Sequence, residues 1–386
     1  MDQRTNQILF MLLRSAIRGT KLTKEELEQY TEDMLPDLLE AANKQDLVHL
    51  LVLGLRQNGL ISKEQMGLKK HILKAVLRYE KIQKEYEQLC EALENLQIPF
   101  LPLKGSVIRK YYPEPWMRTS CDIDVLVHRE DLDRAILGLT EVLKYEERER
   151  GTHDVSLFSI SGVHVELHYD LVEEGRANNA IDVLRTVWEN VSLHEDTGYW
   201  YEMSDAFYYF YHIAHMAKHF ENGGCGIRPF IDLWILDHME GVDQTKRDVL
   251  LEKGDLLKFT QKARVLSEVW FDAKEADEIS LQLQSFLLHG GLFGTSENRV
   301  ALKQTEEGGQ MGYLISRIFV PYEKLQRYYP VLEKHRWLMP FMQVRRWFML
   351  LKPDVAKMAK SEMTSNRNIS KSKADEMKNF LDEIGL

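Results

Sequence analysis

The chain has 386 residues, of which 44% are hydrophobic and 28% are charged, a balance typical of a globular protein and not of a disordered one. Its formal net charge of −10 opposes broad, non-specific binding to nucleic acid, because such binding comes mainly from neutralised phosphates. No apolar run approaches the roughly 18 residues that a membrane span needs, and the three cysteines have no Cys-x-x-Cys spacing. We therefore expect a cytoplasmic protein that has no membrane partner.

The first 97 residues are predicted to be helical. Residues 23–26 match a capping box, in which a Thr side chain caps the helix and a Glu three residues later bonds back. Apolar residues recur at helical spacing over residues 38–51 and again over residues 70–97, where they predict a long helix. We interpret this region as a set of packing helices.

The pattern changes at residue 98. Residues 98–103 are apolar and contain two prolines, which is typical of an edge strand. The elements expected next are a helix at 104–112, a strand at 121–128, a helix at 130–143, and strands at 145–148, 155–160 and 163–169. Strands interleaved with helices and followed by a hairpin predict a small mixed sheet with helices on one side.

Helix signals return after Ser204, which can cap a helix running to Phe220. Gly223 and Gly224 should end that helix, and Pro229 suits the first turn of the next one. The remainder is rich in Leu, Met, Trp and Lys and predicts more helix, followed by a polar tail in which residues 365–372 are expected to be flexible.

These elements predict an α+β fold in four parts. A small mixed-sheet domain is flanked by N-terminal helices and by a C-terminal helical domain. The expected parts are an N-terminal helical region at 1–97, an α/β domain at 98–200, a helical domain at 201–351 and a polar C-terminal tail at 352–386.

Three carboxylates carry the clearest chemical signal. Alternation along the 121–128 strand places Asp122 and Asp124 on one face and its apolar residues on the other. On the 163–169 strand the same alternation leaves Glu166 on the polar face, together with His164 and His168. If the strands are neighbours, the carboxylates can bind Mg²⁺ or Mn²⁺, and we expect them to be metal ligands and catalytic residues. A solvated strand edge and a structural cation site are the alternatives for the two aspartates.

A candidate phosphate site precedes the first aspartate. Lys104, Gly105 and Ser106 open a predicted short helix, whose backbone N–H groups and hydroxyl can face a phosphate. Lys104 and Arg118 carry charges that would complement a triphosphate. The alternative for these two basic residues is a surface position near an acidic sheet end.

The order of these motifs resembles the nucleotidyltransferase superfamily that includes DNA polymerase β. It is most similar to a bacterial branch of uncharacterised nucleotidyltransferases, through Lys104-Gly105, Arg118, the Asp-Ile-Asp-Val-Leu-Val stretch at 122–127 and the Val-Glu-Leu-His stretch at 165–168. The resemblance covers about residues 70–240, and the connection from Gly105 to Asp122 is longer than in the minimal superfamily pattern. It implies that three carboxylates hold two metal ions around an NTP.

A histidine stripe lies on the helix after Ser204. His212 and two further histidines follow the spacing i, i+3, i+7, with a lysine beside them. In the family, similar His and Lys residues, followed by an Arg and an Asp on the next helix, line the nucleotide cleft. The resemblance therefore implies nucleotide-binding roles for His215, Lys218, His219, Arg228 and Asp232. Zinc binding by the stripe is the alternative, although no fourth ligand is evident.

We therefore expect a metal-dependent nucleotidyltransferase that moves NMP from an NTP to a hydroxyl acceptor and releases pyrophosphate. The net acidity favours a small molecule or a protein over nucleic acid as the acceptor. Two alternatives stay open. One is a catalytically silent nucleotide- or protein-binding regulatory module, against which the presence of all three mutually repelling carboxylates argues. The other is a toxin-like nucleotidyltransferase with a partner antitoxin, which would use the same chemistry.

Overall fold

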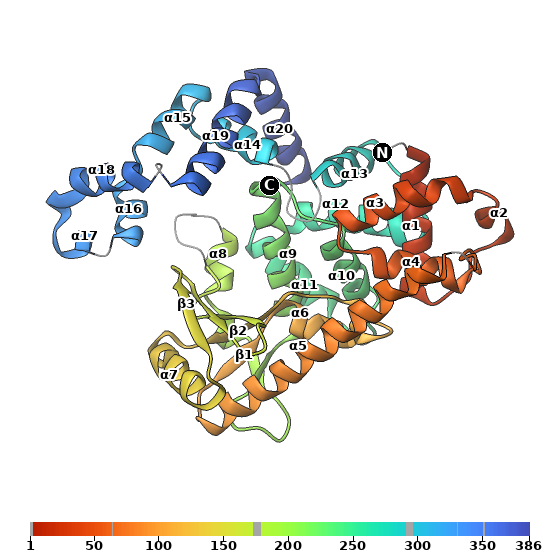
Figure 1. Cartoon of the computed structure of the whole chain (residues 1–386), viewed down its shortest axis with the longest axis horizontal. Coiled ribbons are helices and arrows are strands. Elements are labelled where there is room, and N and C mark those ends of the chain that lie inside the picture. Colours follow the sequence, from red (N-terminus) through yellow and green to blue (C-terminus); the bar gives the residue numbers. More distant parts are fainter. Residues whose placement is uncertain (1–2, 64, 173–178, 291–295, 330, 350–351) are drawn as a thin grey trace. The chain divides into compact units, whose positions relative to one another are not determined.

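The computed structural model describes the whole chain except residues 1–2, 64, 173–178, 291–295, 330 and 350–351. The chain forms two compact units, the first made of Met1–Ala214 and Ile227–Leu281, the second of His215–Gly226 and Gln282–Leu386. The predicted α+β fold is confirmed, because one mixed sheet is surrounded by helices in the first unit (Figure 1). The predicted domain boundaries at 97 and 200 stay predictions, and the one at 351 lies outside the described residues.

The N-terminal region is helical, as predicted. Its helices are α1 (Gln3–Arg18), α2 (Lys24–Leu27), α3 (Leu35–Lys44), α4 (Val48–Gln57) and α5 (Lys69–Asn95). The capping box is confirmed, since Thr23 and Glu26 exchange side-chain and backbone hydrogen bonds at the start of α2. Helices α1 and α4 pack closely at Gly54, where an added Cβ would lie 2.2 Å from the backbone oxygen of Leu12.

Five strands form the sheet. They are β1 (Phe100–Pro102), β2 (Asp122–Val127), β3 (Glu146–Arg150), β4 (Asp154–Phe158) and β5 (His164–His168), in the order β1-β2-β5-β4-β3. Strands β2 and β5 are parallel, and the other neighbours are antiparallel. The sheet is therefore mixed, and the proline-containing β1 lies at its edge, as the sequence predicts.

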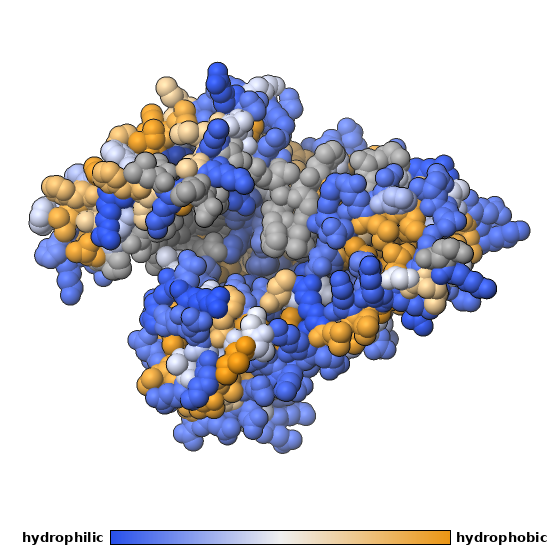
Figure 2. All heavy atoms as spheres, viewed as in Figure 1, coloured by the Kyte–Doolittle hydropathy of each residue, from blue (hydrophilic) through white to orange (hydrophobic). Residues whose placement is uncertain are grey.

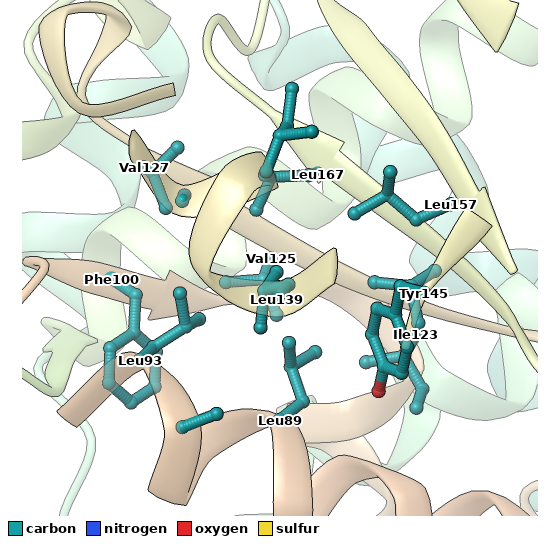
Figure 3. Packing of buried hydrophobic residues seen from close by; sticks show 14 of the residues in the cluster. Leu89, Leu93, Phe100, Ile123, Val125, Val127, Leu139, Tyr145, Leu157 and Leu167 are labelled. Carbon is teal, nitrogen blue, oxygen red and sulfur yellow. The ribbon is translucent and has the colours of Figure 1, made fainter. Parts of the chain in front are cut away.

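One face of the sheet is the core of this part of the molecule. Helices α5 and α7 (Leu132–Leu143) cover it (Figure 1). Figure 3 shows Leu89 and Leu93 of α5 and Leu139 of α7 beside Ile123 and Val125 of β2, and all five side chains are fully buried. Because strand side chains alternate, burying this apolar set directs the intervening polar residues to the opposite face.

Helices follow the sheet within the first unit. They are α8 (Asn179–Leu184), the part of α9 (Asp205–Glu221) up to Ala214, α10 (Arg228–Asp237), α11 (Gln244–Lys253) and α12 (Leu257–Phe271). A small antiparallel hairpin, β6 (Val191–Leu193) and β7 (Tyr201–Met203), precedes α9. The predicted helices from Ser204 and from Pro229 are confirmed as α9 and α10.

The C-terminal region is also helical. Its helices are α13 (Glu278–Gly290), α14 (Ser296–Glu306), α15 (Gln310–Ile318), α16 (Tyr322–Tyr328), α17 (Val331–Lys334), α18 (Met339–Met349), α19 (Pro353–Asn368) and α20 (Lys371–Ile384). Figure 2 shows apolar atoms at the surface of this region, where Trp337, Phe341 and Phe348 are exposed. None of the helices that the structure describes has the length and apolar character needed to cross a membrane.

The expectation of a flexible stretch at 365–372 is wrong. Ser370 caps α20 by accepting a hydrogen bond from the Lys373 backbone N–H, and Ile369 is only 2% exposed. Ile369 and Ala374 belong to a small apolar core that also contains residues of α14 and α15. A few buried anchors therefore order a segment whose composition is mostly polar.

Short 3-10 helices connect the longer elements. They are η1 (Glu32–Met34), η2 (Met66–Leu68), η3 (Arg109–Tyr111), η4 (Pro115–Met117), η5 (Arg129–Asp131), η6 (Val187–Glu189) and η8 (Arg336–Leu338). Helix α6 (Lys104–Ile108) continues directly into η3. Together α6, η3 and η4 make the connection from β1 to β2, which carries much of the candidate site.

Candidate metal and nucleotide site

Strands β2 and β5 bring the predicted carboxylates together. Their parallel register pairs Asp124 with Glu166 and Asp122 with His164. Since the strands are neighbours and their apolar residues face the core, the three acidic side chains lie on the opposite face of the sheet. The geometric condition for a shared cation site is thus met.

Three side chains on this face can hold a metal ion. One ligand atom from each of Asp124, Glu166 and His168 lies within 4.8 Å of the other two. The His168 Nε2 atom is 2.9 Å from Asp124 Oδ1 and 3.4 Å from Glu166 Oε2. His168 was not among the predicted site residues, although the alternation that selected Glu166 also placed His168 on the polar face.

Asp122 is not one of the three residues whose ligand atoms meet. It precedes Asp124 by two residues on the same face of β2. Burial, and then the charge of Asp124, raise the pKa of the Asp122 carboxyl. A cation near both aspartates would reverse this effect, because it would favour the ionised form of Asp122.

Lys104 contacts the acidic cluster directly. Its Nζ atom lies 2.6 Å from Asp124 Oδ1 and 3.6 Å from Glu166 Oε2. Burial alone would lower the pKa of Lys104, but Asp124, the neighbouring Tyr211 and Glu166 outweigh it and raise the pKa, so the side chain is an ammonium. In this structure the positive charge of Lys104 is therefore a partner of the carboxylates.

The same contacts set the charge state of Asp124, which is only 3% exposed. Burial would raise the pKa of its carboxyl, but the Lys104 ammonium and the hydrogen bond from His168 lower it overall. Asp124 is therefore an ionised group in a buried position, stabilised by two nitrogen donors.

The backbone around Lys104 is fixed by several hydrogen bonds. Leu103 N–H donates to the Asp124 carbonyl (2.9 Å), and the Tyr208 hydroxyl donates to the Lys104 carbonyl (3.0 Å). Arg109, which is buried, donates from Nε to the Gly105 carbonyl (2.8 Å). Burial and the charge of Arg118 lower the pKa of Arg109 to about 10. Neither Tyr208 nor Arg109 was predicted, because their roles depend on three-dimensional contacts.

Arg118 and Asp232, both predicted, are paired with each other. The Arg118 Nε atom lies 2.8 Å from Asp232 Oδ1, and the Tyr112 hydroxyl donates to the same oxygen at 2.6 Å. Burial would raise the pKa of Asp232, but Arg118 lowers it. A Cβ built on Gly105 would lie 3.7 Å from Arg118 Nη1, so the guanidinium is beside the Lys104–Gly105 turn.

Arg228 is held by an acidic residue that the sequence did not single out. Its Nη2 atom lies 2.7 Å from Asp46 Oδ2, and Arg78 Nη1 lies 3.2 Å from the same oxygen. Asp46 occupies the turn between α3 and α4, with a left-handed φ of 54°. Burial, followed by the like charge of Arg118, lowers the pKa of Arg228.

The histidine stripe divides into two parts. The His212 Nε2–H group donates to the Pro229 carbonyl (2.9 Å) and joins α9 to α10. His215 and His219 lie with Lys218 on the part of α9 that belongs to the second unit. The Nε2 atoms of the two histidines are 3.3 Å apart. Among the described residues, no histidine of this stripe belongs to a group of three or more metal ligands. The nucleotide-binding roles of His215, Lys218 and His219 stay predictions.

Ser106 lies within α6 and is partly buried. It does not begin the helix, because α6 starts at Lys104, which has a left-handed φ of 46°. A contact between Ser106 and a phosphate therefore also stays a prediction.

A comparison with known proteins agrees with this arrangement. A family model described as uncharacterised nucleotidyltransferase matches residues 32–272 of the chain. The chain belongs to this nucleotidyltransferase family. The match is wider than the resemblance found over about residues 70–240, and it includes every predicted site residue. No curated protein and no solved structure matches the chain.

Membership of the nucleotidyltransferase family implies a nucleotide substrate. The carboxylates of β2 and β5 and the arginines beside Gly105 all belong to the matched residues. The N-terminal helices from η1 onward are also matched, so the Asp46 turn lies within the family region of the chain.

Proposed function

We propose that this protein is a metal-dependent enzyme that transfers NMP from an NTP to a hydroxyl group and releases pyrophosphate. The observation that carries the proposal is the pairing of Asp124 with Glu166 on parallel neighbouring strands of a nucleotidyltransferase family member. Asp122, on the same face, is the third carboxylate. We assign Asp122, Asp124 and Glu166 as catalytic residues and metal ligands.

The donor set fits a divalent cation such as Mg²⁺ or Mn²⁺, because carboxylate oxygens are the ligands that these ions prefer. When bound, the cation would neutralise phosphate charge and lower the pKa of the acceptor hydroxyl. Asp122 and Asp124 would hold it against the triphosphate, and Glu166 would act mainly on the side of the incoming hydroxyl.

Two arginines held in fixed positions by acidic partners support triphosphate binding. Arg118 is oriented by Asp232, and Arg228 is oriented by Asp46, so neither guanidinium has to be ordered when the substrate binds. Lys104, Gly105 and Ser106 would complete the phosphate site. Lys104 would move its ammonium from Asp124 to a phosphate oxygen once a divalent cation takes its place.

The acceptor in this proposal is a small molecule or a protein. A net charge of −10 disfavours an extended nucleic-acid partner. A toxin-like nucleotidyltransferase with a partner antitoxin would use the same chemistry at this site.

One observation favours a second candidate function. The Lys104 ammonium pairs with Asp124 and neutralises its charge without a metal ion. A catalytically silent nucleotide-binding module that holds no metal would need this kind of charge neutralisation. The two functions differ in one measurable property, since a silent module would bind NTP equally well with and without a divalent cation.

Transfer can be tested with purified full-length protein, each of the four NTPs labelled at the α-phosphate, Mg²⁺ or Mn²⁺, and a cell extract as the source of acceptor. We expect label on a discrete acceptor with the wild type and none with Asp122→Asn as the matched control. If no NTP and neither cation gives a labelled product that depends on Asp122, the proposed activity is wrong.

A further inference from the structure

We infer that His168 is a direct ligand of the divalent cation, and that the site therefore binds Mn²⁺ more tightly than Mg²⁺. The inference rests on the proposed function only in that both concern the same cation. It adds a nitrogen ligand to a site that the sequence predicted to contain oxygen ligands alone.

The spacing of the donor atoms supports direct ligation. An octahedral ion with bonds of about 2.1 Å places adjacent donor atoms about 3.0 Å apart. The His168 Nε2 atom lies 2.9 Å from Asp124 Oδ1 and 3.4 Å from Glu166 Oε2. Both nitrogen–oxygen distances are close to the separation of adjacent corners of one coordination sphere, and one ligand atom from each of the three residues lies within 4.8 Å of the other two.

The position of the Lys104 ammonium shows which oxygens stabilise a positive charge. Its ammonium faces the same two oxygens, Asp124 Oδ1 at 2.6 Å and Glu166 Oε2 at 3.6 Å. These oxygens therefore already bind one positive charge. A divalent cation that replaces the ammonium there would be within reach of the His168 ring, whose Nε2 faces the same oxygen pair. To bind the cation, Nε2 would release to solvent the proton that it now donates to Asp124 Oδ1.

The nitrogen donor determines which cation is preferred. Mg²⁺ favours oxygen ligands and retains its waters, whereas affinity for a site with a nitrogen ligand rises from Mn²⁺ along the first-row series. His168 is almost fully buried, so bulk water does not readily replace its ring as a donor. A His168 that only positions Asp124 by a hydrogen bond would affect both cations alike.

Calorimetric titration of the full-length protein with Mn²⁺ and, separately, Mg²⁺ tests the preference. We expect the wild type to bind Mn²⁺ at least about tenfold more tightly, and His168→Asn to lose about 10- to 100-fold in Mn²⁺ affinity. Asn keeps a donor for Asp124, so Mg²⁺ affinity should change by less than about threefold. Equal losses for the two cations would overturn direct ligation.

His164 supplies the matched control. It lies on the same strand and face, but its Nε2 atom bonds to Ser156 Oγ at 3.1 Å, and its Nδ1 atom is 4.0 Å from Glu166 Oε1. We expect His164→Asn to retain the preference for Mn²⁺. A loss of preference in this variant as large as in His168→Asn would contradict the assignment.

A spectroscopic measurement on the wild type does not depend on the folding of any variant. Pulsed electron paramagnetic resonance of the Mn²⁺-loaded protein should show coupling to an imidazole nitrogen. Absence of nitrogen coupling, or of Mn²⁺ binding, would overturn the inference. Transfer without nitrogen coupling would leave the proposed activity intact, whereas nitrogen coupling without any transfer would leave only the metal site.

Discussion

Asp122 and Asp124 occupy different electrostatic environments although two residues separate them on one strand. Asp124 is paired with Lys104 and His168, and these partners lower the pKa of its carboxyl. The pKa of Asp122 is raised, first by burial and then by the charge of Asp124. The same substitution should therefore affect stability differently at the two positions.

Asn at either position should abolish transfer. Asp122→Asn should leave the free energy of unfolding unchanged or raise it, because it removes a charge that burial and Asp124 disfavour. Asp124→Asn should lower it by about 1.5–3 kcal/mol, because Lys104 and His168 lose a charged acceptor. Urea unfolding of both variants beside the wild type measures the difference. Equal stability of the two variants would show that Asp124 is not the paired carboxylate.

Lys104 should compete with the divalent cation for Asp124. In Lys104→Met the competing ammonium is absent, so Mn²⁺ affinity without nucleotide should rise, by about tenfold if one charge-assisted contact worth about 1.5 kcal/mol is removed. NTP affinity should fall, because the contact that we propose between Lys104 and a phosphate is removed. Lys104 has a left-handed φ of 46°. Met, which is also unbranched at Cβ, should adopt this φ with similar strain, so the substitution should leave the backbone unchanged. Unchanged Mn²⁺ binding would contradict the competition.

At the scale of elements, period-two alternation was sufficient to predict most of the carboxylate cluster. It separated Asp122, Asp124 and Glu166 from the apolar face, and the long helix predicted at 70–97 is α5, Lys69–Asn95. The pairing of β2 with β5 was a condition of that prediction, and the register of the sheet satisfies it.

The elements that orient the arginines could not be predicted from local patterns. The turn between α3 and α4 carries Asp46, which binds Arg228, a residue 182 positions later in the chain. No spacing rule connects such distant residues. The same reason explains why Tyr112 and Arg109 were missed, since their importance comes from contacts with Asp232 and Gly105.

Asp46 should affect substrate binding more than chemistry. Asn also tolerates the left-handed φ of 54°, so Asp46→Asn should keep the turn while removing the charge that orients Arg228. We expect KM for NTP to rise about tenfold, as for one charge-assisted contact of about 1.5 kcal/mol, with little change in kcat. Asp133→Asn, which removes an exposed ion pair with Arg150, is the control and should change neither. A fall in kcat at unchanged KM would contradict this role.

The connection between β1 and β2 should make stability depend on pH. His49 Nε2–H donates to the Met117 carbonyl at 2.9 Å, and burial lowers the pKa of His49 from 6.5 to about 4. Below pH 6.5 the unfolded chain takes up a proton that the folded protein does not. The free energy of unfolding should therefore fall between pH 6.5 and 4, by up to about 3 kcal/mol.

His49→Gln tests the origin of this pH dependence. The variant has no titrating ring, so its free energy of unfolding should change less than that of the wild type between pH 7.5 and pH 4.5. Urea unfolding at the two pH values gives the comparison. The same loss of stability in both proteins would assign the effect to other groups.

At the scale of the whole molecule, the family match ends at residue 272, close to the end of the first unit at Leu281. For the region that follows, the sequence predicted helical structure but not the bounds of the individual helices. Composition suggested a polar tail, but the burial of Ile369 and Ala374 shows that a few apolar positions decide its structure. Composition averages over such positions, so it could not predict which part of the tail packs.

The most direct test of the proposed chemistry compares the fates of two phosphates of the same NTP. The full-length protein is incubated with its acceptor source and with NTP labelled at the α- or the γ-phosphate. We expect α-label on the acceptor and γ-label in pyrophosphate, in equal amounts, with both products absent in Asp122→Asn. Transfer of the γ-label to the acceptor, or release of pyrophosphate that does not depend on Asp122, would contradict nucleotidyl transfer at this site.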